Sequence, residues 1–292
     1  MIALFASKLQ ASNLLGKVDI FTSSLNEFEL MAKLQTTEKA TVSDYLYHAK
    51  NQSLEWNDKL KERVSVALDG LSFPLSINPM PLPEEVVFVL TTGLEEGFAA
   101  YTRGNAIFFN ERIIRKHTNL SWLIAHELVH VATRNNSGWK DKLYSTIGFK
   151  PCNTPSFSNQ FQKYLFSNPD SPQINHALEI TYNGIKQKIA PIIFTNQTEY
   201  VGGLFFEYIE VGLFLLDGTN ETDYELFPEE KRIISFGECE EFFQNVGNNT
   251  SYLFHAEEIL ADNIADIYIN RIDSPSPHVS RKILSILNPE SF

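Results

Sequence analysis

The segment LSWLIAHELVHVATR occupies residues 120–134 of the chain. Its apolar residues recur at helical spacing and cover the helix on almost every side. Thr118 or Asn119 can cap the amino end. Two histidines and one glutamate interrupt the apolar surface, and such groups are costly to bury without polar partners. The segment therefore predicts a buried helix that carries a polar site.

The three polar residues belong to an HExxH motif that runs from His126 to His130. Histidines four residues apart lie on one helical face, so both imidazoles can reach one metal ion. Glu127 projects beside them, where it can take a proton from a water that the metal activates. Zinc suits the site because it accepts nitrogen and oxygen ligands, and catalytic zinc keeps one position open for water. We expect His126 and His130 to bind Zn2+ and Glu127 to act as the general base.

A catalytic zinc site needs a third protein ligand, and Asp141 is one candidate. It lies in the segment Gly138-Trp-Lys-Asp-Lys-Leu-Tyr144, which matches the G-x-x-D-x-x-Y pattern of the aspartate-liganded zincins. Asp141 follows His130 so closely that the chain has barely room to leave the helix and return. Asp141 therefore stays as the weaker alternative.

The second candidate is Glu258, on a helix predicted for residues 256–270. Asp262 lies four residues later on the same face, where its carboxylate can accept a hydrogen bond from the other ring nitrogen of a ligand histidine. Neighbouring Glu257 has Ala261 at that spacing, which cannot serve in this way. We therefore favour Glu258 as the third ligand.

The combination of HExxH with a glutamate on a second helix and an aspartate four residues after it resembles the gluzincin metallopeptidases, the thermolysin-like family. The resemblance covers residues 86–134 and 255–271. It implies an α+β zincin-like core, in which a small sheet lies over the HExxH helix. The run EEILADN at residues 257–263 is also similar to a pattern in uncharacterised bacterial zincin-like proteins. The matching residues would take the family's roles: zinc ligands His126, His130 and Glu258, general base Glu127, and Asp262 as the partner that orients a ligand histidine.

The chain departs from thermolysin in the long interval between His130 and Glu258. This interval must be an insertion that forms a subdomain or one wall of the cleft. No motif identifies the groups that would stabilise the transition state. Tyr252, Tyr200 and His278 are candidates on residue type alone.

Apolar runs at residues 86–90, 98–101 and 106–109 predict three strands ahead of the HExxH helix. The strand at 105–110 is interpreted as the edge strand that forms the upper rim of the cleft, with Asn105 and Ala106 as substrate contacts. The whole chain, residues 1–292, is interpreted as a single zincin-like unit. Its expected parts are a mainly helical region (1–84), the sheet and HExxH helix (85–137), the insertion (138–250) and the glutamate-ligand helix with a C-terminal helix (251–292).

Composition excludes several classes of protein. The chain has 24 Lys and Arg against 36 Asp and Glu, a formal net charge of −12, which argues against a nucleic-acid partner. Its two cysteines exclude a disulfide scaffold.

No signal peptide or membrane span is predicted, so a cytoplasmic location is expected. The apolar run at 201–216 is too short for a span and predicts a buried helix or strand pair.

These features together predict a zinc-dependent peptidase that acts on a peptide or protein substrate. The alternative is a catalytically inactive zincin-like module with a binding or regulatory role. A structural zinc site in another kind of hydrolase is a third interpretation. The intact Glu127 favours the peptidase, because a structural site has no use for a base beside its ligands.

Overall fold

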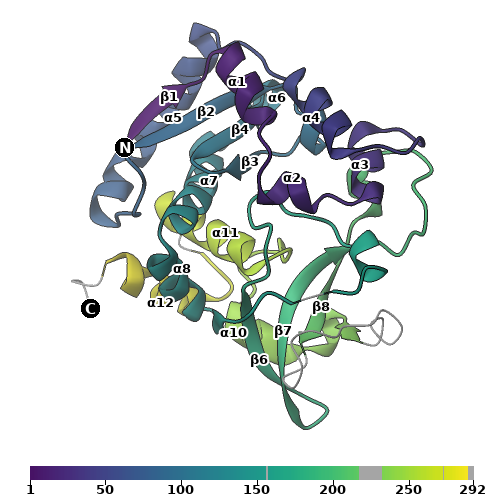
Figure 1. The fold of residues 1–292 in the computed structure, drawn as a ribbon. Coiled ribbons are helices and arrows are strands. Elements are labelled where there is room, and N and C mark those ends of the chain that lie inside the picture. Colours follow the sequence, from purple (N-terminus) through teal and green to yellow (C-terminus); the bar gives the residue numbers. More distant parts are fainter. Residues whose placement is uncertain (156, 217–231, 272, 289–292) are drawn as a thin grey trace.

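A computed structural model of the chain (Figure 1) describes residues 1–155, 157–216, 232–271 and 273–288. It contains helices and two β-sheets, so the protein is of mixed α and β class, as the sequence predicts. Among the described residues, no helix combines the length and the apolar character that crossing a membrane requires.

The first sheet has four strands in the order β1-β2-β4-β3. Strands β1 and β4 both run parallel to β2, whereas β3 is antiparallel to β4. The runs predicted at 86–90 and 106–109 correspond to β2 and β4. The run predicted at 98–101 is displaced, because residues 98–100 form no strand and β3 begins only at Tyr101. Strand β1 is an addition from the N-terminal region. The bounds are β1 (Ile2–Phe5), β2 (Glu85–Thr91), β3 (Tyr101–Arg103) and β4 (Ala106–Asn110).

The prediction that residues 105–110 form an edge strand is wrong. Ala106 of β4 pairs with Val87 of β2 on one side and with Arg103 of β3 on the other. A tight turn at Gly104, whose φ of +63° favours glycine, folds β3 back against β4. Strand β3 is therefore the edge strand on this side of the sheet, opposite β1, and the roles proposed for Asn105 and Ala106 as substrate contacts lose their basis.

Helices cover both faces of this sheet. Alternate residues of a strand point to opposite faces. Phe88 and Phe109 accordingly pack in one core with α5 (Asp58–Ile77) and α7 (Leu120–Asn135). Phe108, the neighbour of Phe109 in β4, points the other way and packs in a second core on the opposite face of the sheet. That second core is completed by α1 (Lys8–Leu15), α3 (Glu27–Leu34) and α4 (Val42–Lys50).

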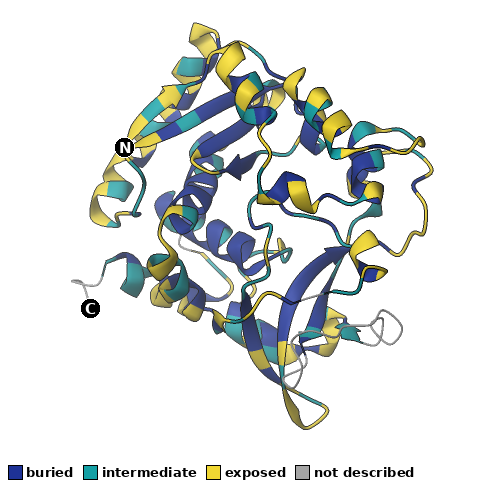
Figure 2. Ribbon diagram, in the orientation of Figure 1, coloured by how far each residue is buried: buried dark blue, intermediate teal, exposed yellow. Residues whose placement is uncertain are grey.

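The HExxH helix α7 begins and ends close to the predicted bounds, and Asn119 caps it by accepting a hydrogen bond from the Trp122 amide. Helix α11 (Ala256–Tyr268) packs along α7. Both helices are buried on most of their surface (Figure 2). Within the residues that the structure describes, the remaining α-helices are α2 (Ile20–Ser24), α6 (Glu111–Lys116), α8 (Ser137–Ser145), α10 (Glu240–Val246) and α12 (Pro277–Leu287). Short 3-10 helices are η1 (Leu94–Glu96), η2 (Phe161–Lys163), η3 (Phe205–Tyr208) and η5 (Phe236–Glu238).

The predicted insertion contains a second, antiparallel sheet with the strand order β5-β6-β7-β8-β9. The apolar run at 201–216 does not form one buried element. Val201 and Leu204 lie exposed in a loop, and only the second half of the run forms a strand, β8. The strands are β5 (Phe149–Pro151), β6 (His176–Tyr182), β7 (Ile185–Phe194), β8 (Glu210–Leu216) and β9 (Ile233–Ile234).

The packing of α7 predicts the cost of truncating its core face. Leu128 is fully buried in the core between the first sheet, α5 and α11. We expect Leu128→Ala to lower the free energy of unfolding by about 2–5 kcal/mol, measured by urea denaturation. Leu9→Ala, at an exposed position of α1, should change it by less than about 0.5 kcal/mol. Equal effects of the two substitutions would contradict this packing.

Candidate metal centre

Two histidines on α7 and one glutamate on α11 converge in the buried contact between these helices. Oε2 of Glu258 lies 3.1 Å from Nε2 of His126 and 3.4 Å from Nε2 of His130. One ligand atom from each of the three residues lies within 4.8 Å of the others. The side chains are therefore arranged as a nitrogen, nitrogen and oxygen donor set around one point.

The donor set fits a metal ion. Nε2 of His130 is buried and has no hydrogen-bond partner within the described part of the chain. Buried polar atoms are nearly always satisfied, so an orphaned nitrogen aimed at two other donor atoms calls for a ligand. A cation held by the three residues would satisfy it.

A carboxylate holds the far ring nitrogen of His126. Nδ1 of His126 lies 2.9 Å from Oδ1 of Asp262, the residue predicted for this place. The other oxygen of Asp262 accepts a hydrogen bond from the hydroxyl of Thr250. Such a pair fixes the orientation and tautomer of a ligand imidazole.

Glu257 plays the corresponding part for His130, a role that the sequence pattern does not indicate. Oε1 of Glu257 lies 3.2 Å from Nδ1 of His130. The hydroxyls of Thr133 and Tyr144 both donate hydrogen bonds to Glu257. Successive residues on a helix point about 100° apart, so the adjacent carboxylates of Glu257 and Glu258 reach different nitrogens of the same imidazole. Two adjacent glutamates on the helix that faces HExxH are therefore the sequence feature that could have indicated the role of Glu257.

Glu127 lies beside the three donor residues and is held from the first sheet. Its Oε2 accepts a hydrogen bond of 2.7 Å from the hydroxyl of Thr102 on the edge strand β3. Burial raises the pKa of Glu127 above its usual range, although the charges of His130 and His126 oppose the shift. A carboxyl group with a raised pKa is suited to accept and release a proton near neutral pH.

Asp170 joins the centre from the loop between η2 and β6. Atoms of Asp170, Glu127 and His130 lie within 4.8 Å of one another. Nδ2 of Asn168, in the same loop, donates a hydrogen bond of 2.6 Å to Oε1 of Glu258. These contacts join residues far apart in the sequence, and no motif in the loop indicates them.

Asp141, the alternative third ligand, lies outside the centre. Its Oδ1 is 3.0 Å from Nε2 of His176, and its side chain is half exposed. It belongs to neither group of described residues that can hold a metal ion.

The three candidates for transition-state stabilisation lie in different places. The ring of Tyr252 lies 6.2 Å from that of His126, centroid to centroid, so this tyrosine is near the centre. Tyr200 packs in a separate apolar cluster and donates to the carbonyl of Gly203. His278 is exposed on α12.

The electrostatics of the centre favour a cation. Burial disfavours the charged imidazolium, yet hydrogen bonds to Asp262 and Glu258 raise the pKa of His126 to about 10. Burial likewise opposes the charge of Glu258, but the neighbouring charge of His130 holds its pKa well below the usual range. Without a metal ion the carboxylates therefore retain a proton on the imidazoles, and a metal must displace it.

Residues 95–138 match the family model described as eCIS core domain. The matched segment runs from η1 through β3, β4 and α7 and includes the HExxH motif. It ends before Glu258. No curated protein and no solved structure matches the chain.

The raised pKa of His126 predicts how metal affinity depends on pH. With its pKa at about 10, His126 carries a proton between pH 6 and 8 in the metal-free protein. Burial opposes the charge of His130 as well, but the charges of Glu258 and Asp170 raise its pKa well above the usual range. Binding must release one proton from each imidazole, so the apparent dissociation constant for Zn2+ should rise about 100-fold for each unit by which pH is lowered. Competition titrations with a chromogenic chelator measure this slope. A flat profile would contradict the protonation state.

The carboxylates of Glu257 and Asp262, which contact the far ring nitrogens of the two histidines, predict a partial loss of metal affinity when they are replaced. Glu257→Gln and Asp262→Ala should each weaken Zn2+ binding by roughly 10- to 100-fold, because the imidazoles lose basicity and fixed orientation. Asp141→Ala is the matched control and should leave the affinity unchanged. An empty site in the Asp141 variant would instead restore that residue as a ligand.

Proposed function

We propose that the protein is a zinc-dependent peptidase of gluzincin type that hydrolyses peptide bonds with Glu127 as general base. The observation that carries the proposal is the position of Glu127. Its carboxylate is held by Thr102 beside His130 and is left out of the donor set formed with Glu258. A structural metal site needs no such neighbouring carboxylate.

The proposed ion is Zn2+, held by His126, His130 and Glu258. Two imidazole nitrogens and one carboxylate oxygen are the donor set of catalytic zinc in thermolysin-type enzymes, which leaves a coordination position for water or substrate. When bound, zinc supplies a Lewis acid that lowers the pKa of water and polarises the scissile carbonyl. The family match over the HExxH segment supports this proposal.

In the proposed reaction, Glu127 accepts the proton of the attacking water and passes it to the leaving amine nitrogen. The hydroxyl of Thr102 keeps the Glu127 carboxylate in place throughout. Asp262 and Glu257 hold the imidazoles by their far nitrogens. Ligation, orientation and proton transfer are thus carried out by different side chains.

The free edge of β3 is the proposed substrate-binding strand. It carries Thr102 and therefore lies directly beside Glu127. An extended peptide can add to such an edge through main-chain hydrogen bonds, which places a peptide carbonyl close to the base. This replaces the contacts assigned to Asn105 and Ala106.

One observation favours the alternative of an inactive binding or regulatory module. Glu127 is 2% exposed and His130 is 0% exposed, so neither can reach a substrate in this conformation. A module that has lost peptidase activity would need no access to these groups. Substitution of the base separates the two functions.

Glu127→Gln should abolish hydrolysis while metal binding and folding persist. Glutamine keeps the size of the side chain and can still accept the Thr102 hydrogen bond, but it cannot carry the proton. Proton transfer by a positioned group is typically worth about 10²–10⁴ in rate, so digestion of a peptide library should slow at least about 100-fold. Mass spectrometry of the digest and zinc analysis measure the two properties.

Glu62→Gln, at an exposed position on α5, is the matched control and should cleave like the wild type. A wild-type protein that binds zinc and cleaves no peptide would favour the inactive module. Equal cleavage by the wild type and the Glu127 variant would show that Glu127 is not the base.

A further inference from the structure

Residues 168–171, Asn-Pro-Asp-Ser, cross the candidate metal centre as a short strap. Asn168 donates a hydrogen bond of 2.6 Å to Oε1 of Glu258, and Oδ1 of Asp170 accepts one of 2.6 Å from the backbone N–H of Thr102. The strap thus contacts both a proposed zinc ligand and the edge strand. We refer to these four residues as the strap.

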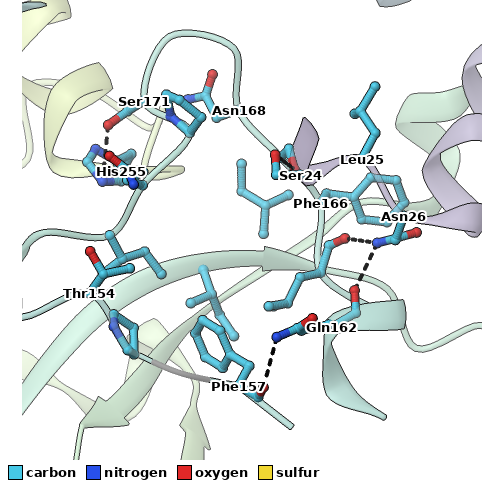
Figure 3. A pocket seen from close by; sticks show the side chains of 18 of the residues that line it. Ser24, Leu25, Asn26, Thr154, Phe157, Gln162, Phe166, Asn168, Ser171 and His255 are labelled. Carbon is cyan, nitrogen blue, oxygen red and sulfur yellow. Dashed lines mark hydrogen bonds between the residues drawn. The ribbon is translucent and has the colours of Figure 1, made fainter. Parts of the chain in front are cut away.

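Two further side chains anchor the strap. Arg134 on α7 donates hydrogen bonds of 3.1 Å and 2.8 Å to the carbonyls of Pro169 and Asp170. Oγ of Ser171 lies 3.4 Å from Nε2 of His255, the capping residue of α11 (Figure 3). All of these contacts are polar, and no strand pairing holds the strap.

The contact with Thr102 occupies the edge that an extended peptide would use. Strand β3 pairs with β4 on one side only, and its other side is one of the two edges of the sheet. The N–H of Thr102 points to that free side, because it donates to Asp170. The Asp170 carboxylate therefore stands where the carbonyl of an added strand would accept the same hydrogen bond.

The strap also closes the path to the proton-transfer group. Asp170, Glu127 and His130 offer atoms within 4.8 Å of one another, so the Asp170 carboxylate fills the space beside the base. With the strap in place, Glu127 and His130 are buried.

Two cavities lie on either side of the strap. One, of about 590 Å³, is lined by Phe157, Phe166 and His255 and reaches Asn168 and Ser171 (Figure 3). The other, of about 460 Å³, lies at the end of β3 beside Gly104 and reaches Asp170. Ser171 of the strap lines both cavities, so the strap borders each of them.

We propose that the strap is a built-in inhibitory segment that occupies the substrate path and must swing away before a peptide can bind. The inference rests on the proposed peptidase function. The loss of one polar anchor is expected to raise the fraction of molecules with the strap open about tenfold. With the strap in place, the edge of β3 and Glu127 are closed to substrate. Release of the strap would make both accessible.

Two substitutions each remove a different contact of the strap. Amide exchange measures how often the strap opens, and peptide cleavage measures access to the centre. Arg134→Ala removes the hydrogen bonds to the Pro169 and Asp170 carbonyls, together with a longer one of 3.5 Å to the Gly104 carbonyl, and leaves the Thr102 contact chemically intact. Amide exchange at Thr102, measured by NMR on the metal-free protein, should become about tenfold faster. Asp170→Ala removes the substrate-mimicking carboxylate, and cleavage of a quenched fluorescent peptide library by the zinc-loaded protein should rise about tenfold or more.

Glu62→Gln is the control, because Glu62 is exposed on α5 and lines neither cavity. It should change neither Thr102 exchange nor cleavage. Faster Thr102 exchange with no cleavage by any variant would support the strap as a cover and refute the peptidase. Unchanged exchange in the Arg134 variant, or wild-type cleavage as fast as that of the Asp170 variant, would overturn the inhibitory strap.

Discussion

The Glu258 carboxylate lies between the Nε2 atoms of two histidines in the buried contact between α7 and α11. Burying these groups is unfavourable unless every polar atom has a partner. The surroundings meet that constraint: Asp262 and Glu257 hold the far imidazole nitrogens, and Asn168 holds the second oxygen of Glu258. Within the described part of this centre, Nε2 of His130 stays unsatisfied, and it faces the point where the donor atoms converge. The packing of the two helices and the chemistry of the centre thus depend on the same set of contacts.

Thr102 connects this centre to the sheet. Its hydroxyl holds the carboxylate of Glu127, and its backbone N–H holds Asp170 of the strap. The proposed base, the free strand edge and the covering segment therefore meet at one residue of β3. A peptide that displaced the strap would take the N–H of Thr102 without disturbing its hydroxyl, so binding and proton transfer can share the residue.

Local sequence patterns predicted the parts of the molecule that local chemistry determines. The bounds of α7 and α11 follow from apolar periodicity, and the i to i+4 spacing of Glu258 and Asp262 indicated two of the carboxylates that face the histidines. The same spacing argument set Glu257 aside, although its carboxylate holds His130. The order of strands did not follow, because pairing of β3 outside β4 depends on a hairpin turn and not on the composition of either strand. The strap contacts join residues distant in the chain, which no local pattern encodes.

The central claim is that one zinc ion binds between α7 and α11 in a site completed by Glu258. The most direct test is crystallographic: an anomalous difference map of the zinc-loaded protein, from data collected on either side of the zinc absorption edge. We expect a single strong peak within bonding distance of His126 Nε2, His130 Nε2 and a Glu258 oxygen. The absence of a peak there, or a peak at Asp141 instead, would contradict the claim.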